Sequence, residues 1–264
     1  MDYEKLKLIK EDILKEPLIL KSDSNEFCGL YVDGTGELTF ELADASFHAF
    51  KVYSEYNYPV YLFISLENDK DEIEKIVKKY SDTKVYSVAP LKTALLYNEW
   101  FFNCPWFYID PKYERVCTFQ VDGAVISKGW ESYFVNGDWD FIGASWRSDI
   151  KALAYNHELK TLKVANGGMS CRKIKSMIKV VQFVNKYGGQ HKFFKGVQID
   201  GIVKQDNSWL AEDLMACSVG FTFDLFKPLT EEESKKFGHE PIELSLYMNK
   251  SSPLRPMSFH KIDN

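Results

Sequence analysis

Segments typical of strands and of helices alternate through the first half of this chain, and this alternation restricts the fold more than any other feature. Residues 60–65 and 84–88 have the apolar, β-branched character of buried strands, whereas residues 45–56, 70–80 and 91–102 have helical patterns. Strands that alternate with helices pair in parallel, and helices then cover both faces of the sheet. We therefore predict an α/β fold: a Rossmann-like domain with a mainly parallel central sheet flanked by helices.

The loops that follow the expected strands indicate where a ligand would bind. In a parallel sheet the loops after Ser65, Val88 and Asp122 would meet at the carboxyl edge, where α/β proteins bind their ligands. Residues 116–119 have the β-branched and aromatic character of a strand, and Gln120 opens the turn that carries Asp122. This edge is the expected crevice for a nucleotide.

The N-terminal segment gives further expectations. Residues 1–16 predict a charged helix and residues 18–20 a short strand. Residues 29–32 and 37–40 are interpreted as a hairpin, because the glycines of Asp33-Gly34-Thr35-Gly36 supply the positive φ of a turn. In that interpretation the Gly-Thr-Gly sequence precedes a strand, which argues against a phosphate-binding loop.

In the second half, a pair of glycines separates two expected elements. We expect a strand over residues 162–165, a loop at Asn166-Gly167-Gly168, and a helix over residues 171–187 that Gly188-Gly189 ends. Glycines in such a loop let the backbone approach a sugar or a phosphate closely. A plain turn is an equally good interpretation of these glycines.

Composition and charge narrow the functional classes. The chain has 264 residues and a formal net charge of −5, which gives no support for nucleic-acid binding. It has no apolar run of the ~18 residues that a membrane span needs and no apolar signal-peptide core, so we expect a cytoplasmic protein. Five cysteines form no Cys-x-x-Cys pair, which argues against a disulfide framework or a zinc site. We expect one domain, with a nucleotide half over about residues 1–125 and an acceptor half over residues 126–264.

A series of short blocks carries a resemblance to a known family. The blocks are Gln120-Val121-Asp122, Trp139-Asp140-Phe141-Ile142-Gly143-Ala144-Ser145-Trp146, Ala165-Asn166-Gly167-Gly168-Met169-Ser170, Glu212-Asp213 and Phe259-His260. In order and spacing they resemble an uncharacterised family of glycosyltransferase-like proteins that are often encoded in polysaccharide loci. The resemblance covers about residues 95–262, and it implies the glycosyltransferase A fold.

The resemblance implies roles for the donor side of the site. Asp122, with His260 as a second ligand, would hold Mn²⁺ or Mg²⁺ against the donor diphosphate. Gln120 stands where the commoner motif has a first Asp, so the protein supplies less negative charge. Asn166, Gly167 and Gly168 would line the donor-sugar and acceptor site. Taken alone, Asp122-Gly123 is also a good turn.

The acidic pair Glu212-Asp213 implies the catalytic chemistry. In the resembling inverting enzymes, the second acid of such a pair deprotonates the acceptor hydroxyl, which gives Asp213 the role of base and Glu212 that of orienting the acceptor. The competing interpretation is a pair of acids favoured by the dipole at a helix N-terminus. Arg172 and Lys173 could meet a phosphate, although exposed ion pairs are the commoner role of such residues.

The resemblance thus implies a metal-dependent, inverting glycosyltransferase. It would move a sugar from a nucleoside diphosphate donor, a UDP-sugar, to a hydroxyl of a glycan or glycoprotein acceptor. Alternatives are a retaining transferase of the same fold and a non-catalytic carbohydrate-binding protein. A nucleotidyltransferase is disfavoured, because no glycine-rich loop followed by Lys or Arg is present.

Overall fold

The computed structural model describes residues 3–19, 21–146, 148–164, 166–204, 210–239, 247, 249–250 and 256–260. The helices are α1 (Tyr3–Ile13), α2 (Phe40–Tyr53), α3 (Lys70–Lys79), α4 (Ala94–Asn103), the 3₁₀ turn η1 (Pro105–Phe107), α5 (Trp130–Gly137), α6 (Ile174–Lys186), α7 (Gln190–Phe193), α8 (Glu212–Thr222) and α9 (Glu231–Phe237). The strands are β1 (Phe27–Asp33), β2 (Val60–Ser65), β3 (Lys84–Val88), β4 (Arg115–Phe119), β5 (Gly123–Val125), β6 (Phe141–Ala144), β7 (Ile150–Ala154), β8 (Asn166–Lys173), β9 (Phe194–Ile199), β10 (Ile202–Lys204), β11 (Gly238–His239) and β12 (Ser258–His260).

Six strands form the central sheet in the order β3-β2-β1-β4-β8-β6. Neighbours from β3 through β4 pair in parallel, and β8 runs antiparallel to both β4 and β6. The prediction of a mainly parallel α/β sheet is therefore confirmed. After β3 the chain crosses to the other side of β1 to form β4, so the strand order reverses between β1 and β4. The carboxyl ends at such a reversal border a ligand crevice in open α/β sheets.

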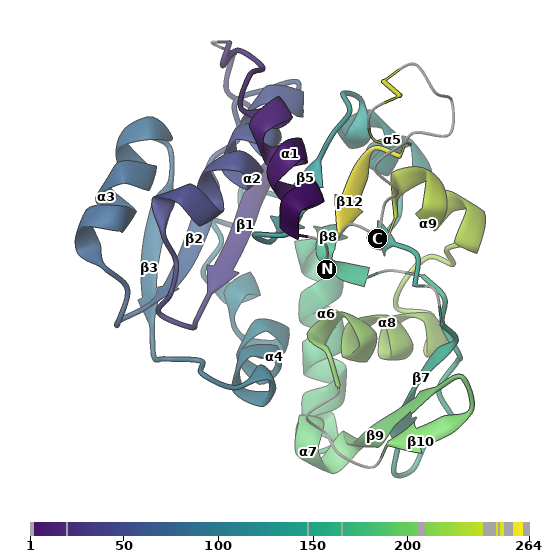
Figure 1. Ribbon diagram of the computed structural model, residues 1–264. Helices are drawn as coiled ribbons and strands as arrows, with labels where there is room; N and C mark the ends of the chain where they lie inside the picture. Colours follow the sequence, from purple (N-terminus) through teal and green to yellow (C-terminus); the bar gives the residue numbers. More distant parts are fainter. Residues whose placement is uncertain are drawn as a thin grey trace.

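Two smaller sheets complete the fold, and one of them brings the C-terminal segment to the central sheet. β12 pairs antiparallel with β5 and parallel with β11, and its His260 lies opposite Gly123. Figure 1 shows β12 (yellow) beside β5, close to the start of β8 and to α1. The other small sheet, β10-β9-β7, lies beyond α8 at the opposite end of the molecule in this view.

The N-terminal hairpin prediction was wrong. Residues 29–32 belong to β1, a central strand, and Phe40 begins α2 instead of ending a second strand. Thr39 is the N-cap of α2, because its hydroxyl accepts a hydrogen bond from the Leu42 N–H at 3.3 Å. The Gly-Thr-Gly sequence therefore joins a strand to a helix. Residues 18 and 19 form no strand, and residue 20 lies outside the described residues.

The expected strand and loop around residue 165 were also placed wrongly. Asn166, Gly167 and Gly168 are the first residues of β8, and the helix that follows begins at Ile174. Leu162 makes only an isolated bridge, and residue 165 lies outside the described residues. Two glycines in a strand leave room for neighbouring backbone to approach, which is how they are used here.

The core has two parts, one on each face of the central sheet. Phe27 and Tyr31 of β1 point to the face covered by α1, α2, α3 and α5, whereas Leu30 and Val32 point to the face covered by α4, α6 and α8. All five cysteines are unpaired thiols, and four of them are buried. Trp139 is buried against Tyr133, in keeping with a core role. Within the described residues no helix combines the length and the apolar character needed to cross a bilayer.

Replacing Gly29 by alanine should destabilise the fold. A Cβ at this β1 position would lie 2.9 Å from Phe50 Cε1 and 3.1 Å from Phe119 Cε1, and both rings are buried. We expect Gly29→Ala to lower the free energy of unfolding by about 1–3 kcal/mol, measured by urea denaturation. Glu37→Ala, at an exposed loop position, is the control and should change little. An unchanged Gly29→Ala protein would contradict this packing.

Candidate active site

The turn after β4 and the start of β8 lie against each other at the carboxyl edge of the sheet. The N–H of Gly123 donates to the Gln120 carbonyl at 3.1 Å, which closes the turn that carries Asp122. A Cβ added to Gly123 would lie 2.9 Å from the Gly168 carbonyl oxygen. Because the His260 backbone is paired opposite Gly123, three blocks that are far apart in the sequence meet at one place.

Gly167 lets the start of α8 approach β8. Its N–H donates to Asp213 Oδ2 at 2.5 Å. A Cβ on Gly167 would lie 2.7 Å from both Asp213 Cβ and Glu212 Oε1, so a larger residue would push the helix away. Asn166 Oδ1 accepts the Gly168 N–H at 2.9 Å, which means that its amide oxygen supports the backbone of β8.

A buried ion pair joins β8 to α8. Arg172 is fully buried, and its Nη2 and Nη1 donate to Glu212 Oε1 at 2.9 Å and Oε2 at 3.5 Å. Its Nε donates to Ser170 Oγ at 2.9 Å, and the guanidinium carbon lies 4.5 Å from the centre of the Phe141 ring. Arg172 is therefore an internal residue, and the expectation of an exposed ion pair was wrong for it. Lys173 does form a more exposed ion pair, with Asp138.

The carboxyl group of Asp213 has a strongly raised pKa. Burial raises the pKa of Asp213 to about 7, and the neighbouring carboxylate of Glu212 adds to the rise. The charge of Arg172 and the N–H donors of Gly167 and Leu214 act in the opposite direction. A carboxyl group with this pKa can hold or accept a proton near neutral pH, as a general base requires.

The structure also brings together residues that the sequence did not single out. Tyr97 of α4 accepts a hydrogen bond from Gln120 Nε2 at 3.1 Å, and burial raises the pKa of its phenol. Asp33, at the end of β1, accepts the N–H and the hydroxyl of Thr35 at 2.9 and 2.7 Å. If the segment had been interpreted as a strand, a Gly-x-Gly loop and a helix, Asp33 would have been a candidate residue at the end of the strand. No local sequence pattern indicates Tyr97.

Lys10 of α1 is a cation in this neighbourhood. Burial lowers the pKa of Lys10, and the carboxylates of Asp122 and Glu41 oppose this fall. Lys10 lines a narrow recess together with Val121, Gly123 and Phe259. Residues of the N-terminal helix thus border the Asp122 turn, which nothing in the charged pattern of residues 1–16 indicates.

Ser65 lies at the same edge of the sheet, after β2. Its hydroxyl accepts the Glu67 N–H at 3.1 Å, and a Cβ on Gly36 would lie 3.7 Å from this hydroxyl. The loops after β1 and β2 are therefore neighbours. The side chain of Ser65 is buried beneath them.

The fit of a divalent cation depends on the ligands near Asp122. Over the described part of the chain, no group of three or more His, Cys, Asp or Glu side chains is placed to hold a metal ion. The register nevertheless puts the backbone of His260 next to that of Gly123, the residue after Asp122. The side chain of His260 lies outside the described part of the structure, which leaves the carboxylate of Asp122 as the described donor at this turn. Mg²⁺ is commonly held by one or two carboxylates together with substrate phosphates, and a single carboxylate is compatible with such a cation.

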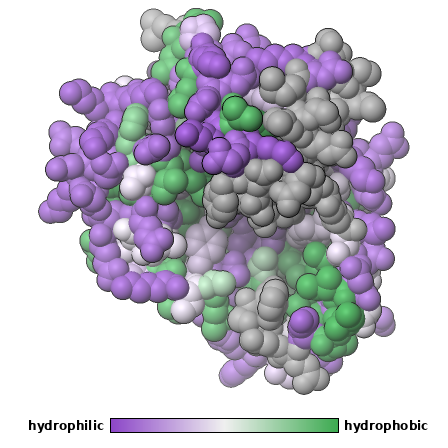
Figure 2. All heavy atoms as spheres, viewed as in Figure 1, coloured by the Kyte–Doolittle hydropathy of each residue, from purple (hydrophilic) through white to green (hydrophobic). Residues whose placement is uncertain are grey.

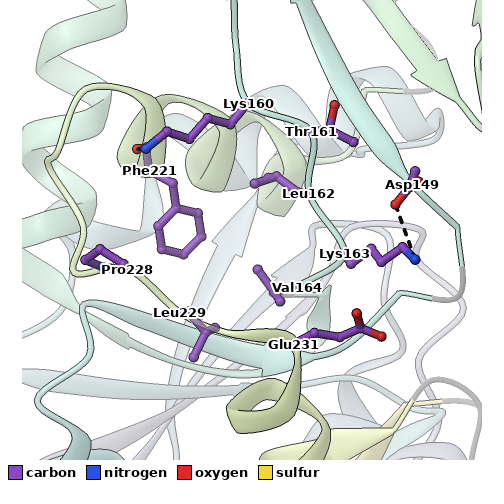
Figure 3. Close-up of a pocket in the computed structure, with 10 residues that line it drawn as sticks. All are labelled: Asp149, Lys160, Thr161, Leu162, Lys163, Val164, Phe221, Pro228, Leu229 and Glu231. Carbon is purple, nitrogen blue, oxygen red and sulfur yellow. Dashed lines mark hydrogen bonds and ion pairs between the residues drawn. The ribbon is translucent and has the colours of Figure 1, made fainter.

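A cavity of about 650 Å³ lies at the other end of α8. Figure 2 shows that the molecule is hollowed across its middle, in the region where Figure 1 places α8. The residues that line the cavity, drawn in Figure 3, are Asp149, Lys160, Thr161, Leu162, Lys163, Val164, Phe221, Pro228, Leu229 and Glu231.

The chain thus has an α/β fold whose strand order reverses between β1 and β4, and three blocks of its sequence meet at that edge of the sheet. Residues 82–260 match the family described as Protein of unknown function (DUF5672), and the chain belongs to this family. No curated protein matches the chain.

Solved structures of three transferases or synthases are similar to the chain. 4-Diphosphocytidyl-2C-methyl-D-erythritol synthase from Anaerococcus prevotii has 14% identity and a TM-score of 0.44, over 76% of this chain and 83% of that one. The mannosyltransferase Ktr4p from S. cerevisiae has 10% identity and a TM-score of 0.45, over 71% and 70% of the two chains. Mouse xyloside xylosyltransferase 1 has 9% identity and a TM-score of 0.46, over 89% and 96%.

Breaking the buried ion pair on one side should be costly. In Arg172→Met the carboxylate of Glu212 stays buried without its partner, and we expect a loss of about 3–5 kcal/mol in the free energy of unfolding. The double variant Arg172→Met/Glu212→Leu should recover most of this loss, because neither charge remains. Urea denaturation of the single and double variants measures the coupling. A double variant no more stable than Arg172→Met would contradict the pairing.

The raised pKa of Asp213 should appear in the pH dependence of stability. The folded state holds this proton more tightly than the unfolded state, so the contribution of Asp213 to stability falls as pH rises from about 4 towards 7. The unfolding free energy of Asp213→Asn, relative to the unsubstituted protein, should therefore improve between pH 5 and pH 7.5. Asp138→Asn is the control, because the ion pair with Lys173 lowers the pKa of Asp138 and its effect should be constant over this range. An equally constant difference for Asp213→Asn would show that the pKa is not raised.

Proposed function

We propose that this protein is an inverting glycosyltransferase that moves a sugar from a UDP-sugar to a hydroxyl of a glycan acceptor. The observation that supports the proposal is that the Asp122 turn and Asp213 both lie against the first residues of β8. Asp122 follows β4 at the reversal of strand order, and Asp213 lies in the first turn of α8. Gly168 touches the turn of Asp122, and the adjacent Gly167 touches Asp213. An acid for the donor and an acid for the acceptor are thus separated by two glycines.

On the donor side, we assign the diphosphate to the Asp122 turn. Asp122 and His260 would hold Mn²⁺ or Mg²⁺, which when bound offsets the charge that develops on the departing nucleoside diphosphate. Lys10 would add a positive charge at the same place. Ser65 and Gln120, at the ends of β2 and β4, would line the nucleotide side of the crevice.

On the acceptor side, we assign proton transfer to Asp213. Its carboxylate would accept the proton of the acceptor hydroxyl as the hydroxyl oxygen attacks the anomeric carbon from the face opposite the leaving group. A pKa of about 7 leaves a large fraction of this carboxyl ionised at neutral pH. Asn166, Gly167 and Gly168 would line the donor-sugar and acceptor site through the backbone of β8, which the two glycines hold close to Asp213 and to the Asp122 turn.

Glu212 would act through its neighbours. Its carboxylate accepts hydrogen bonds from Arg172. We therefore assign Glu212 a positioning role instead of the direct contact with the acceptor that the sequence predicted. The ion pair fixes the first turn of α8, and the charge of Glu212 raises the pKa of Asp213. Both effects favour a base that is correctly placed and active near neutral pH.

The proposal is tested first by nucleotide binding and then by transfer. Thermal unfolding with uridine, guanosine, cytidine and thymidine diphosphates and their sugars, each with Mn²⁺, Mg²⁺ or EDTA, should show stabilisation by one nucleotide family that EDTA abolishes. Asp122→Ala should remove this stabilisation. Asp213→Asn should keep it but lower the transfer rate by about 10²–10⁴-fold, and the rate of the unsubstituted protein should rise with pH through about 7.

Asp71→Asn, on the exposed side of α3, is the matched control and should bind and transfer normally. If no nucleotide stabilises the protein, the proposal is contradicted and a carbohydrate-binding protein is favoured. A product that retains the donor's anomeric configuration, determined by NMR, would leave the transferase but remove the assignment of Asp213 as base.

A further inference from the structure

The cavity at the C-terminal end of α8 has an apolar floor and a polar rim. Figure 3 shows Leu162, Val164, Phe221 and Leu229 directed toward one common space. The first three of these side chains are buried in the protein and present only part of their surface to the cavity. The rim consists of exposed or half-exposed polar residues, among them Thr161.

The charges on the rim are already matched. Lys163 forms an ion pair with Asp149 at 3.5 Å, drawn in Figure 3. Lys160 donates to the Phe221 carbonyl at 2.6 Å, and Glu231 pairs with Lys235. A phosphate or a carboxylate would have to displace these partners. A ligand that offers hydroxyl groups and apolar C–H surface, but no charge, suits this lining without such a cost.

The cavity and the candidate active site lie at opposite ends of α8. Val164 is two residues before Asn166, with which β8 begins. Phe221 lies eight residues after Asp213 on α8, a separation of about 12 Å along the helix axis at 1.5 Å per residue. One sugar residue cannot occupy both ends of this distance. A glycan that reaches both would be an oligosaccharide that passes over the elements covering α8, because residues Glu212 to Phe221 are buried.

We propose that this cavity is a distal acceptor subsite that binds neutral sugar residues of an oligosaccharide whose end lies at Asp213. The assignment as an acceptor subsite rests on the proposed transferase function. Sugar C–H faces would pack on Phe221 and Leu229, and sugar hydroxyls would meet the rim at Thr161 and Lys163. The protein would then favour an extended glycan over a monosaccharide acceptor.

Binding can be measured without catalysis. In protein labelled at leucine, valine and threonine methyl groups, NMR titration with maltohexaose, cellohexaose and chitohexaose should shift the resonances of Leu162, Val164 and Leu229 with at least one of them. Glucose should do so much more weakly, and inorganic phosphate should not do so. If no oligosaccharide shifts these resonances, or if phosphate shifts them equally, the proposal is overturned.

A substitution on the rim locates the effect. Thr161→Trp fills the mouth of the cavity from an exposed position and should weaken binding of the responding oligosaccharide at least tenfold. The KM for that oligosaccharide as the acceptor in the transfer reaction should rise by the same factor, whereas kcat and the KM for the donor should not change. Asn156→Trp, exposed and outside the cavity lining, is the matched control. Equal affinity in Thr161→Trp and the unsubstituted protein would overturn the location.

The two proposals can fail separately. Stabilisation by a nucleotide together with silent cavity methyl groups would reject the subsite and leave the transferase intact. Methyl shifts with oligosaccharide, in a protein that no nucleotide stabilises, would reject both the transferase and the acceptor role of the cavity.

Discussion

The ion pair between Arg172 and Glu212 is the interaction on which the site depends. Removing two charges from water is unfavourable, and here the cost is offset by a two-point contact, a hydrogen bond to Ser170 and the ring of Phe141. The pair fixes the first turn of α8 against β8, which places Asp213 on the Gly167 N–H. Burial is the largest cause of the raised pKa of Asp213; the charge of Glu212 adds to the rise and that of Arg172 opposes it. The packing of α8 against β8 therefore sets both the position of the candidate base and the burial that raises its pKa.

The sequence predicted those parts of the fold that local periodicity specifies. β2 and β3 have the bounds expected from their buried, β-branched segments, and α3 follows its amphipathic pattern. β1 and the loop after it were misinterpreted because Asp33-Gly34-Thr35-Gly36 has the same turn chemistry in a hairpin as in a strand-to-helix connection. The partners of β1 are β2 and β4, which are distant in sequence, and no local signal reports such pairing. β8 was missed because glycines in a strand look like a loop when their packing partner, the start of α8, is unknown.

The candidate site was predictable to a similar extent. The blocks containing Asp122, Gly167 and Asp213 were expected to act together, and the structure brings them together. Arg172 was expected at the surface because charged residues are seldom fully buried unless they are paired, and its partner Glu212 is forty residues away. Lys10 belongs to a helix whose sequence shows only a charged surface, so its approach to Asp122 depends on tertiary packing alone.

The pairing of β12 with β5 has a consequence for how the protein is made. β5 stands outside the central sheet, and in the described residues its strand partner is β12, from the last part of the chain. During synthesis the central sheet can assemble once β8 has left the ribosome, but β5, next to the Asp122 turn, gains its strand pairing with β12 only after residue 260 has emerged. The entropic cost of closing this long loop is only slightly larger than that of closing a shorter one. Because the two strands are far apart in the sequence, we nevertheless expect their pairing to form late in folding. A nascent chain would thus have a formed central sheet before the strand pairing beside the Asp122 turn was complete.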